Sequence, residues 1–323
     1  MKTLYFPAFL FTILLTTHAA FAETLPGIPE FIDEMVAKHH FKKNELQHVF
    51  EKYQYRQNVI DAISRPSTTK PWLEYRAAFV NPKRIKFGLQ FWDKYRLTLR
   101  RAEKKYGIPQ EIIIAIIGVE TIYGRNTGSF LVLDSLTTLA FDYPRRAEFF
   151  RSELENFLLL AREQEFDLLA VRGSYAGAIG VPQFMPSSYR KYAIDFNNNK
   201  KIDLMHEDRD AIGSVANYLR EYGWIKGAPI AVRAKIDLEA CAGDTTTPRP
   251  ISAWQADGIV ADDPVNQSET ARLMDFTIQD GKEFWLALNN FDVITRYNNS
   301  DFYAMSVFQL AEALKAAHHP KAK

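Results

Sequence analysis

An eight-residue apolar run, Ile112–Val119, places the tightest constraint on how this chain of 323 residues can fold. Pro109 stands just before it, and proline is favoured in the first turn of a helix. Eight apolar residues are far fewer than the roughly 20 that cross a bilayer. The sequence therefore predicts a helix from Pro109 to about Gly124 whose apolar side chains are buried in a protein core.

Glu120 follows this run directly and shares the buried side of the helix, because it lies three residues after Ile117 and four after Ile116. Burial disfavours a charged carboxylate, and the partial negative charge of a helix C-terminus acts in the same direction. We therefore expect a raised pKa for Glu120. A carboxyl that keeps its proton near neutral pH can act as the general acid of glycosidic cleavage. The alternative is a structural glutamate that is bonded to nearby backbone.

The first 22 residues are typical of an export signal. Lys2 precedes an apolar run from Leu4 to Leu15, and Ala20-Phe21-Ala22 has the small-x-small pattern that signal peptidase cleaves. The alternative is a membrane anchor, but the run is too short to span a bilayer. We expect cleavage after Ala22, a mature chain that starts at Glu23, and no lipid attachment, since no cysteine lies near the cleavage site.

Charge and cysteine content exclude several classes of protein. The 40 basic and 39 acidic side chains give a net charge of +1, so the chain lacks the basic surplus of nucleic-acid-binding proteins. Cys241 is the only cysteine, which excludes an intrachain disulfide and a thiolate metal cluster. Stability must come from packing, for which a hydrophobic content of 47% is sufficient.

The patterning along the chain predicts an α+β fold that is mainly α. Helices are expected from Arg145 to about Gln164, from Asp210 to Tyr222 and from Met305 to Ala317, and another helix should end at Gly107. The glycine-rich stretch Arg172–Gln183 is expected to line a cleft, since glycine lets backbone approach a ligand closely. The expected segments are a signal peptide (1–22), a helical N-terminal region (23–98), a core (99–228), a small mixed α/β insertion (229–290) and a segment that returns to the core (291–323).

Five strings along the chain resemble the lytic murein transglycosylase B family and occur in that family's order. They are Gly118–Arg125, Phe141–Arg146, Gln183–Ser188, Asp210–Tyr218 and Asn290–Asn298. The resemblance covers roughly residue 71 to the C-terminus and is weakest in the insertion. It implies a lysozyme-like core, peptidoglycan glycan strands as the partner, and a periplasmic location in a Gram-negative cell. From the charge balance and the short apolar runs we expect neither a nucleic-acid partner nor a membrane span, and protein partners stay unknown.

The resemblance also implies the reaction. The bond between N-acetylmuramic acid and N-acetylglucosamine is cleaved without water and without a cofactor, and the product carries a 1,6-anhydro ring. One glutamate, matched by Glu120, serves first as acid and then as base. Two alternatives stay open: a catalytically silent peptidoglycan-binding or scaffold protein, and a hydrolytic muramidase. Glu120 favours an enzyme over the silent binder, and the product mass separates the muramidase by one water.

Sugar-binding positions follow from the same resemblance. They are Ser174 and Gln183 as polar contacts beside the acid, Tyr75, Tyr218, Tyr297 and Tyr303 as groove-lining aromatics, Asn298 as a further polar groove residue, and Arg145 and Arg146 near the peptide or lactyl carboxylates of the glycan. Core packing is the alternative for each tyrosine. For the two arginines the alternative is a solvated helix start.

The stretch Asp195–Asp203 resembles the EF-hand-like calcium loop of this family. The implied ligands are Asp195, Asn197, Asn199, the backbone carbonyl of Lys201 and, just past the loop, the closing acid Asp210. Lys200 stands where a glycine eases the sharp turn, and His206 replaces the usual bidentate glutamate at position twelve. These departures predict either weak binding of a structural calcium ion or a loop that is structural without metal.

Overall fold

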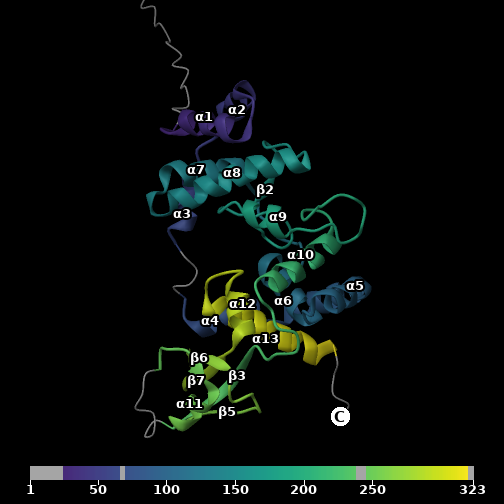
Figure 1. Cartoon of the computed structure of the whole chain (residues 1–323), viewed down its shortest axis with the longest axis vertical. Coiled ribbons are helices and arrows are strands. Elements are labelled where there is room, and N and C mark those ends of the chain that lie inside the picture. Colours follow the sequence, from purple (N-terminus) through teal and green to yellow (C-terminus); the bar gives the residue numbers. More distant parts are fainter. Residues whose placement is uncertain (1–24, 66–69, 238–244, 319–323) are drawn as a thin grey trace, which may run out of the picture. The chain divides into compact units, whose positions relative to one another are not determined.

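The computed structural model describes residues 25–65, 70–237 and 245–318 (Figure 1). The expected signal segment and Cys241 lie outside these residues. The chain divides into two compact units, residues 1–54 and residues 55–323. None of the described helices combines the length and the apolar character needed to span a bilayer.

The described part of the first unit is a pair of helices, α1 (Ile28–His39) and α2 (Lys43–Glu51). Pro29 lies in the first turn of α1. Phe31 and Phe50 pack edge to face, with ring centroids 6.0 Å apart, and both side chains are buried. This contact closes the pair because each helix is apolar on one side only.

Helices dominate the second unit. They are α3 (Gln57–Ile63), α4 (Trp72–Phe79), α5 (Pro82–Tyr106), α6 (Gln110–Thr121), α7 (Val132–Asp142), the 3-10 helix η2 (Pro144–Arg146), α8 (Ala147–Gln164), α9 (Pro186–Tyr192), α10 (Asp208–Glu221), α11 (Ile251–Ala256), α12 (Asn289–Thr295) and α13 (Asp301–His318). The strands are β1 (Phe130–Leu131), β2 (Arg172–Gly173), β3 (Ala231–Ile236), β4 (Arg249–Pro250), β5 (Ile259–Ala261), β6 (Thr270–Ile278) and β7 (Gly281–Ala287). The helices expected to begin near residues 145, 210 and 305 are thus present as η2 with α8, α10 and α13.

Helix α6 is the core of this unit. Every residue from Ile112 to Val119 is buried, and α5, α10 and α13 pack around the helix. Fully burying one isoleucine stabilises the fold by about 1.5–3 kcal/mol, so the isoleucines of this run together contribute on the order of 10 kcal/mol. The predicted buried helix is confirmed. It ends at Thr121, before the expected Gly124, because Ile122 and Tyr123 adopt left-handed backbone with φ of 52° and 60°.

The insertion forms an antiparallel sheet of five strands in the order β4-β6-β7-β3-β5. Helix α11 contributes Ile251 and Trp254 to a separate buried cluster with residues of the sheet, including Val232 and Leu286. The expected small mixed insertion is confirmed. Helix α4 joins this sheet to the helical part, since Trp72 packs on Phe276 at 4.6 Å between ring centroids.

Helix α5 ends as predicted at Gly107, which has φ of 76°. The helix crosses the expected segment boundary after residue 98, and both α4 and α5 pack against α13. The division of the chain into five segments stays a prediction.

Gly118 lets Tyr123 fold back against α6. A Cβ at Gly118 would lie 2.5 Å from the Tyr123 hydroxyl oxygen and 2.7 Å from Cζ of the same ring. The tyrosine is buried, and its hydroxyl has no hydrogen-bond partner within the described part of the chain. Close approach of these two residues therefore fixes how α6 ends, directly beside Glu120.

We expect Gly118→Ala to lower the free energy of unfolding by about 1–3 kcal/mol, because the added methyl group overpacks a buried contact. Guanidinium denaturation followed by circular dichroism measures this change. Tyr123→Phe alone should cost little, since the hydroxyl forms no bond there, and it should recover part of the loss in the double variant. A Gly118→Ala protein as stable as the native one would show that the contact is not tight.

Candidate active site

Glu120 lies in the last turn of α6, and the residue as a whole is partly exposed. Tyr303, in the first turn of α13, donates its hydroxyl to Oε1 of Glu120 at 2.5 Å. The phenol is 2% exposed and therefore has a fixed position. Packing of α13 on α6 thus orients the carboxyl through one hydrogen bond.

Burial raises the pKa of Glu120 to about 7, as the sequence predicts. The Tyr303 hydroxyl and the positive charge of Arg84 act in the opposite direction and limit the rise. Both favour the carboxylate, the first by a hydrogen bond and the second by attraction. The group therefore titrates near neutral pH. At that pH its protonated and ionised forms have similar free energies, so it can act both as an acid and as a base.

Arg84, on α5, is a site residue that sequence reasoning missed. Its Nε donates to the carbonyl of Gly118 at 3.0 Å, and its Nη1 donates to the carbonyl of Ala78 at 2.7 Å. The half-buried guanidinium is thereby fixed next to the C-terminal end of α6, whose partial negative charge attracts it. Because Arg84 precedes Glu120 by more than 30 residues, no local motif connects the two.

Three of the four predicted tyrosines gather around Glu120. Besides Tyr303, Tyr75 and Tyr297 lie close enough for the glutamate's charge to raise their pKa values further, although burial is the larger cause. The pKa of Tyr75 rises to about 12. Tyr297 stacks on Tyr303 with ring centroids 6.4 Å apart and donates to the carbonyl of Pro182 at 2.5 Å. All three phenols thus remain neutral hydrogen-bond donors at physiological pH.

Tyr218 is placed differently. Its ring is 5% exposed and its hydroxyl donates to the carbonyl of Arg296 at 2.6 Å. The ring packs on Tyr297 at 4.9 Å, so Tyr218 supports the tyrosine that lies nearer the glutamate. This environment matches the core-packing alternative, and a groove-lining role for Tyr218 stays a prediction.

The glycine-rich segment is bonded to the end of α6 through Thr121, whose hydroxyl donates to the carbonyl of Val181 at 2.8 Å. Ser174 and Gln183 hold the segment in shape. The Ser174 hydroxyl accepts from the backbone N–H groups of Ala176 and Ala178, while the Gln183 amide donates to backbone carbonyls at 3.0 and 2.9 Å. Both side chains are half-buried, and their contact with a sugar stays a prediction.

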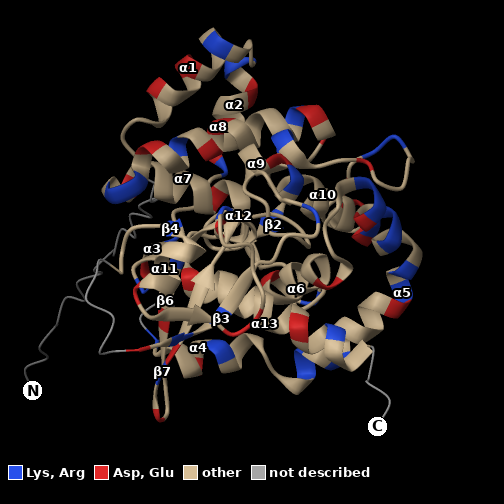
Figure 2. Cartoon of the chain, turned by 60° about the horizontal axis from the view of Figure 1, so that its bottom comes forward, with Lys and Arg blue, Asp and Glu red and all other residues tan. Residues whose placement is uncertain are grey.

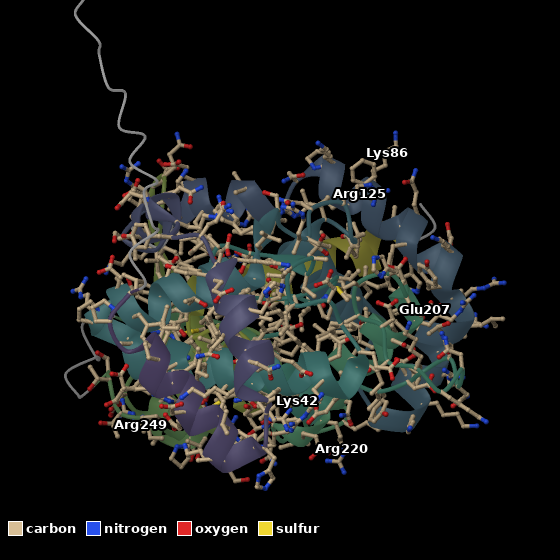
Figure 3. All side chains as sticks on the ribbon, turned by 90° about the horizontal axis from the view of Figure 1, so that it is seen from above. Lys42, Lys86, Arg125, Glu207, Arg220 and Arg249 are labelled. Atoms are coloured by element: carbon tan, nitrogen blue, oxygen red, sulfur yellow. The ribbon has the colours of Figure 1, made fainter. Side chains whose placement is uncertain are left out.

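Arg145, Arg146 and Asn298 are exposed, as ligand-binding side chains on a rim would be. Arg146 lies over the ring of Phe149 at 4.3 Å, which restrains its guanidinium. A further cation, Arg125, follows the end of α6 and lies over the ring of Phe87 at 4.0 Å; Figure 3 labels Arg125 and the exposed Lys86. The structure records no contact of Arg145, Arg146 or Asn298 with Glu120 among the described residues.

The predicted calcium loop is organised by hydrogen bonds from backbone N–H groups to its own side chains. The Asp195 carboxylate accepts from Asn199 and Lys200, and Lys200 has the positive φ of 69° that its position requires. The buried Asp210 carboxylate accepts from Phe196 and, at Oδ2, from Asp203. Asp210 therefore holds the loop from beneath, and its expected role as a ligand stays a prediction.

Other buried carboxyls in the described part of the second unit have structural partners. Glu153 accepts from the backbone N–H and the hydroxyl of Ser187, and Asp134 forms an ion pair with Arg56 at 2.7 Å. Glu120 differs from them in combining a pKa near 7 with a residue that is partly exposed. The site is therefore built around one proton-transfer group.

Comparison with known proteins agrees with this geometry. Residues 24–312 match the family model described as a transglycosylase SLT domain. The chain is 42% identical to membrane-bound lytic murein transglycosylase B of Escherichia coli K12 over 302 residues, which cover 90% of this chain and 83% of the relative.

Two solved structures resemble the fold. The Escherichia coli lytic transglycosylase Slt35 in complex with calcium superposes with a TM-score of 0.85 at 42% identity, covering 93% of this chain and 95% of its own. SltB3 from Pseudomonas aeruginosa in complex with NAG-anhNAM-pentapeptide gives a TM-score of 0.79 at 29% identity, covering 89% and 78%. The predicted family and the lysozyme-like fold are confirmed.

We expect Arg84→Met to raise the pKa of Glu120, because the buried carboxylate loses its nearest fixed positive charge. Titration of the Glu120 carboxyl carbon by NMR measures this directly. Arg84→Lys should raise the pKa less, since a charge remains. Lys86→Met, two residues away at an exposed position of the same helix, is the control and should leave the titration unchanged. If the Arg84→Met titration coincides with that of the native protein, the guanidinium does not act on the glutamate.

Proposed function

The chain belongs to the transglycosylase SLT domain family, and we propose that Glu120 carries out its chemistry as first the acid and then the base. Family membership together with its relatives makes the protein a lytic murein transglycosylase that acts on peptidoglycan. The observation that carries the proposal is the carboxyl of Glu120, with a pKa near 7, held by Tyr303 at the end of a buried helix.

In the first step the protonated Glu120 gives its proton to the oxygen that links N-acetylmuramic acid to N-acetylglucosamine. The bond from that oxygen to C1 of the muramic acid breaks, and positive charge develops on the ring. Glu120 becomes a carboxylate at this moment. The Tyr303 hydroxyl and the Arg84 charge both favour that form, so they lower the cost of giving up the proton.

In the second step the carboxylate takes the proton from the 6-hydroxyl of the same muramic acid. The oxygen then bonds to C1 and closes a 1,6-anhydro ring, and Glu120 regains the proton it started with. An intramolecular hydroxyl has a very high effective molarity, so neither water nor a second carboxylate is needed. Support comes from the single proton-transfer carboxyl described for the site and from the complex of the SltB3 relative with NAG-anhNAM-pentapeptide.

The surrounding residues receive binding roles in this proposal. Ser174 and Gln183 form polar contacts beside the acid, and Tyr75 and Tyr297 line the sugar groove. Asn298 serves as an additional polar groove residue. The exposed guanidinium groups of Arg145 and Arg146 bind the peptide or lactyl carboxylates, which suit paired donors.

The glycan strand is proposed to reach this site in the periplasm, after export and cleavage of the signal behind Ala22. A hydrolytic muramidase usually needs a second carboxylate, either as the base that activates a water or as the nucleophile that attacks C1. The buried carboxyls described above are already held by structural partners, which supports the non-hydrolytic route.

Glu120→Gln should abolish turnover, to below about 1% of native activity, because an amide can neither give nor take the proton. Mass spectrometry of digested sacculi measures the anhydro product, and a sacculus pull-down should show binding that is nearly unchanged. The same variant should melt at a higher temperature at pH 8. Ionised Glu120 disfavours the native state above its unfolded pKa, and this cost disappears in the amide. Residual activity well above this level would contradict the single-residue mechanism.

The loop around Asp195 is proposed to hold a structural calcium ion. Its donors are oxygens, as a hard cation requires, and each side-chain oxygen that accepts one backbone N–H keeps a second lone pair. The described ranges contain no group of three or more His, Cys, Asp or Glu side chains suited to a metal. The proposed calcium loop does not form such a group, because most of its ligands are asparagine amides and a backbone carbonyl. A binding site with so few charges should be weak, and the calcium complex of Slt35 supports the assignment.

Calcium at 1 mM should stabilise the native state by about 1.4 kcal/mol if the Kd is near 0.1 mM, which raises the melting temperature by roughly 2 °C. Asp195→Ala should lose this increment. Asp275→Ala, which removes an exposed carboxylate of the sheet, should keep it. A native melting temperature that does not respond to calcium would show that the loop is maintained by its own hydrogen bonds.

A further inference from the structure

The second half of α5 exposes a dense group of cations, here called the basic face. Its members are Lys94, Arg96, Arg100, Arg101, Lys104 and Lys105, and all six are exposed. Figure 2 shows blue residues along this helix. The whole chain carries a net charge of only +1, so the surplus is local.

This face opposes the stability of its own helix. Arg96, Arg100 and Lys104 follow one another at intervals of four residues, and like charges at this spacing repel. Lys104 gains from the negative end of the helix, but Arg96 and Arg100 lie one and two turns further from it. No ion pair is recorded for these three residues among those the structure describes.

The acids that lie nearest are engaged elsewhere. Asp93 is 3.9 Å from a ring nitrogen of His318, and Asp208 accepts the hydroxyl of Tyr95 and lies 3.9 Å from Lys94. Glu103 accepts from the side chain of Gln110. Arg96, Arg100 and Lys104 therefore repel one another without a recorded ion pair among the described residues, and their charges are free to bind an anionic partner outside the chain.

Two features of the basic face indicate the kind of partner. Leu97 stands in its middle with 75% of its surface exposed, the largest value among the exposed large apolar side chains. Beside it, an open pocket of about 490 Å³ separates α5 from the calcium loop, and its lining consists of Leu97, Thr98, Arg101, Asn197, Asn199 and Arg209. Arg101 is held flat over the ring of Phe196 at 3.9 Å. Two guanidinium groups with amide and hydroxyl donors suit a phosphate oxyanion.

We propose that the basic face binds the surface of a bilayer that contains anionic phospholipid. Headgroup phosphates pair with the arginines and lysines, one phosphate enters the pocket between Arg101 and Arg209, and Leu97 inserts at the interface. The exposed leucine favours a lipid surface over the peptide carboxylates of the glycan, which offer no apolar layer. The interaction is separate from the chemistry of Glu120 and would hold the enzyme reversibly beside a membrane.

Flotation of the purified exported protein with vesicles tests this. We expect binding to vesicles of phosphatidylcholine with 30% phosphatidylglycerol, little binding to pure phosphatidylcholine, and loss of binding in 0.5 M NaCl. The triple variant Arg96→Gln/Arg100→Gln/Lys104→Gln should bind roughly 100-fold more weakly, since each cation near an anionic surface contributes about a fivefold change. Leu97→Gln should also weaken binding while leaving the salt dependence in place.

The matched control is Lys70→Gln/Lys235→Gln/Lys282→Gln, which lowers the net charge equally but removes cations paired with Glu74, Asp262 and Asp275. It should bind like the native protein. The triple variant of α5 should melt at or above the native temperature, because repulsion has been removed. Equal binding of both triple variants overturns the proposal. The proposal is also overturned if the native protein does not bind anionic vesicles and the α5 triple variant binds purified sacculi more weakly than the native protein does. That result would assign the basic face to the carboxylates of the glycan.

Discussion

Burial of α6 is the constraint on which the rest of the structure depends. An apolar helix with no polar side can be satisfied only by neighbours on every side, and α5, α10 and α13 supply them. These helices come from distant parts of the sequence, so packing around α6 brings their side chains to its end. The same packing removes water from Glu120, a carboxyl at the end of this helix, and so raises its pKa. The burial that stabilises the hydrophobic core therefore also sets the acidity of the reactive group.

The charge of Glu120 is balanced between opposing effects. Burial alone would favour a permanently protonated acid, which would give up its proton too reluctantly to protonate the leaving oxygen. The Tyr303 hydrogen bond and the charge of Arg84 favour the carboxylate, and together they leave the pKa near neutrality. Since the same group must be acid and base in one cycle, a pKa close to ambient pH serves both halves. The tyrosines nearby add donors without adding charge.

Electrostatics organise the surface of this unit as well as the site. The loop around Asp195 and the basic face of α5 meet at the pocket between Arg101 and Arg209. Hydrogen bonds from backbone N–H groups to Asp195 and Asp210 give this loop a defined form. Net charge gives no hint of the basic face, because a sum over the chain cancels cations on one helix against acids elsewhere.

The sequence by itself determined the buried helix, the position of Glu120 on it, the helices near residues 145, 210 and 305, the small mixed insertion and the family, since periodicity, capping residues and motifs are local properties. It missed α7 and α9, which overlap motifs that were recognised for other reasons. Only the tertiary structure decided that Tyr303 bonds to Glu120, that Arg84 is the nearby cation, and that Tyr218 is packed beneath Tyr297. The physical reason is that hydrogen bonds and Coulomb interactions act across space. Arg84 and Tyr303 lie 36 and 183 positions from Glu120 along the chain, so no local sequence pattern shows that they meet it.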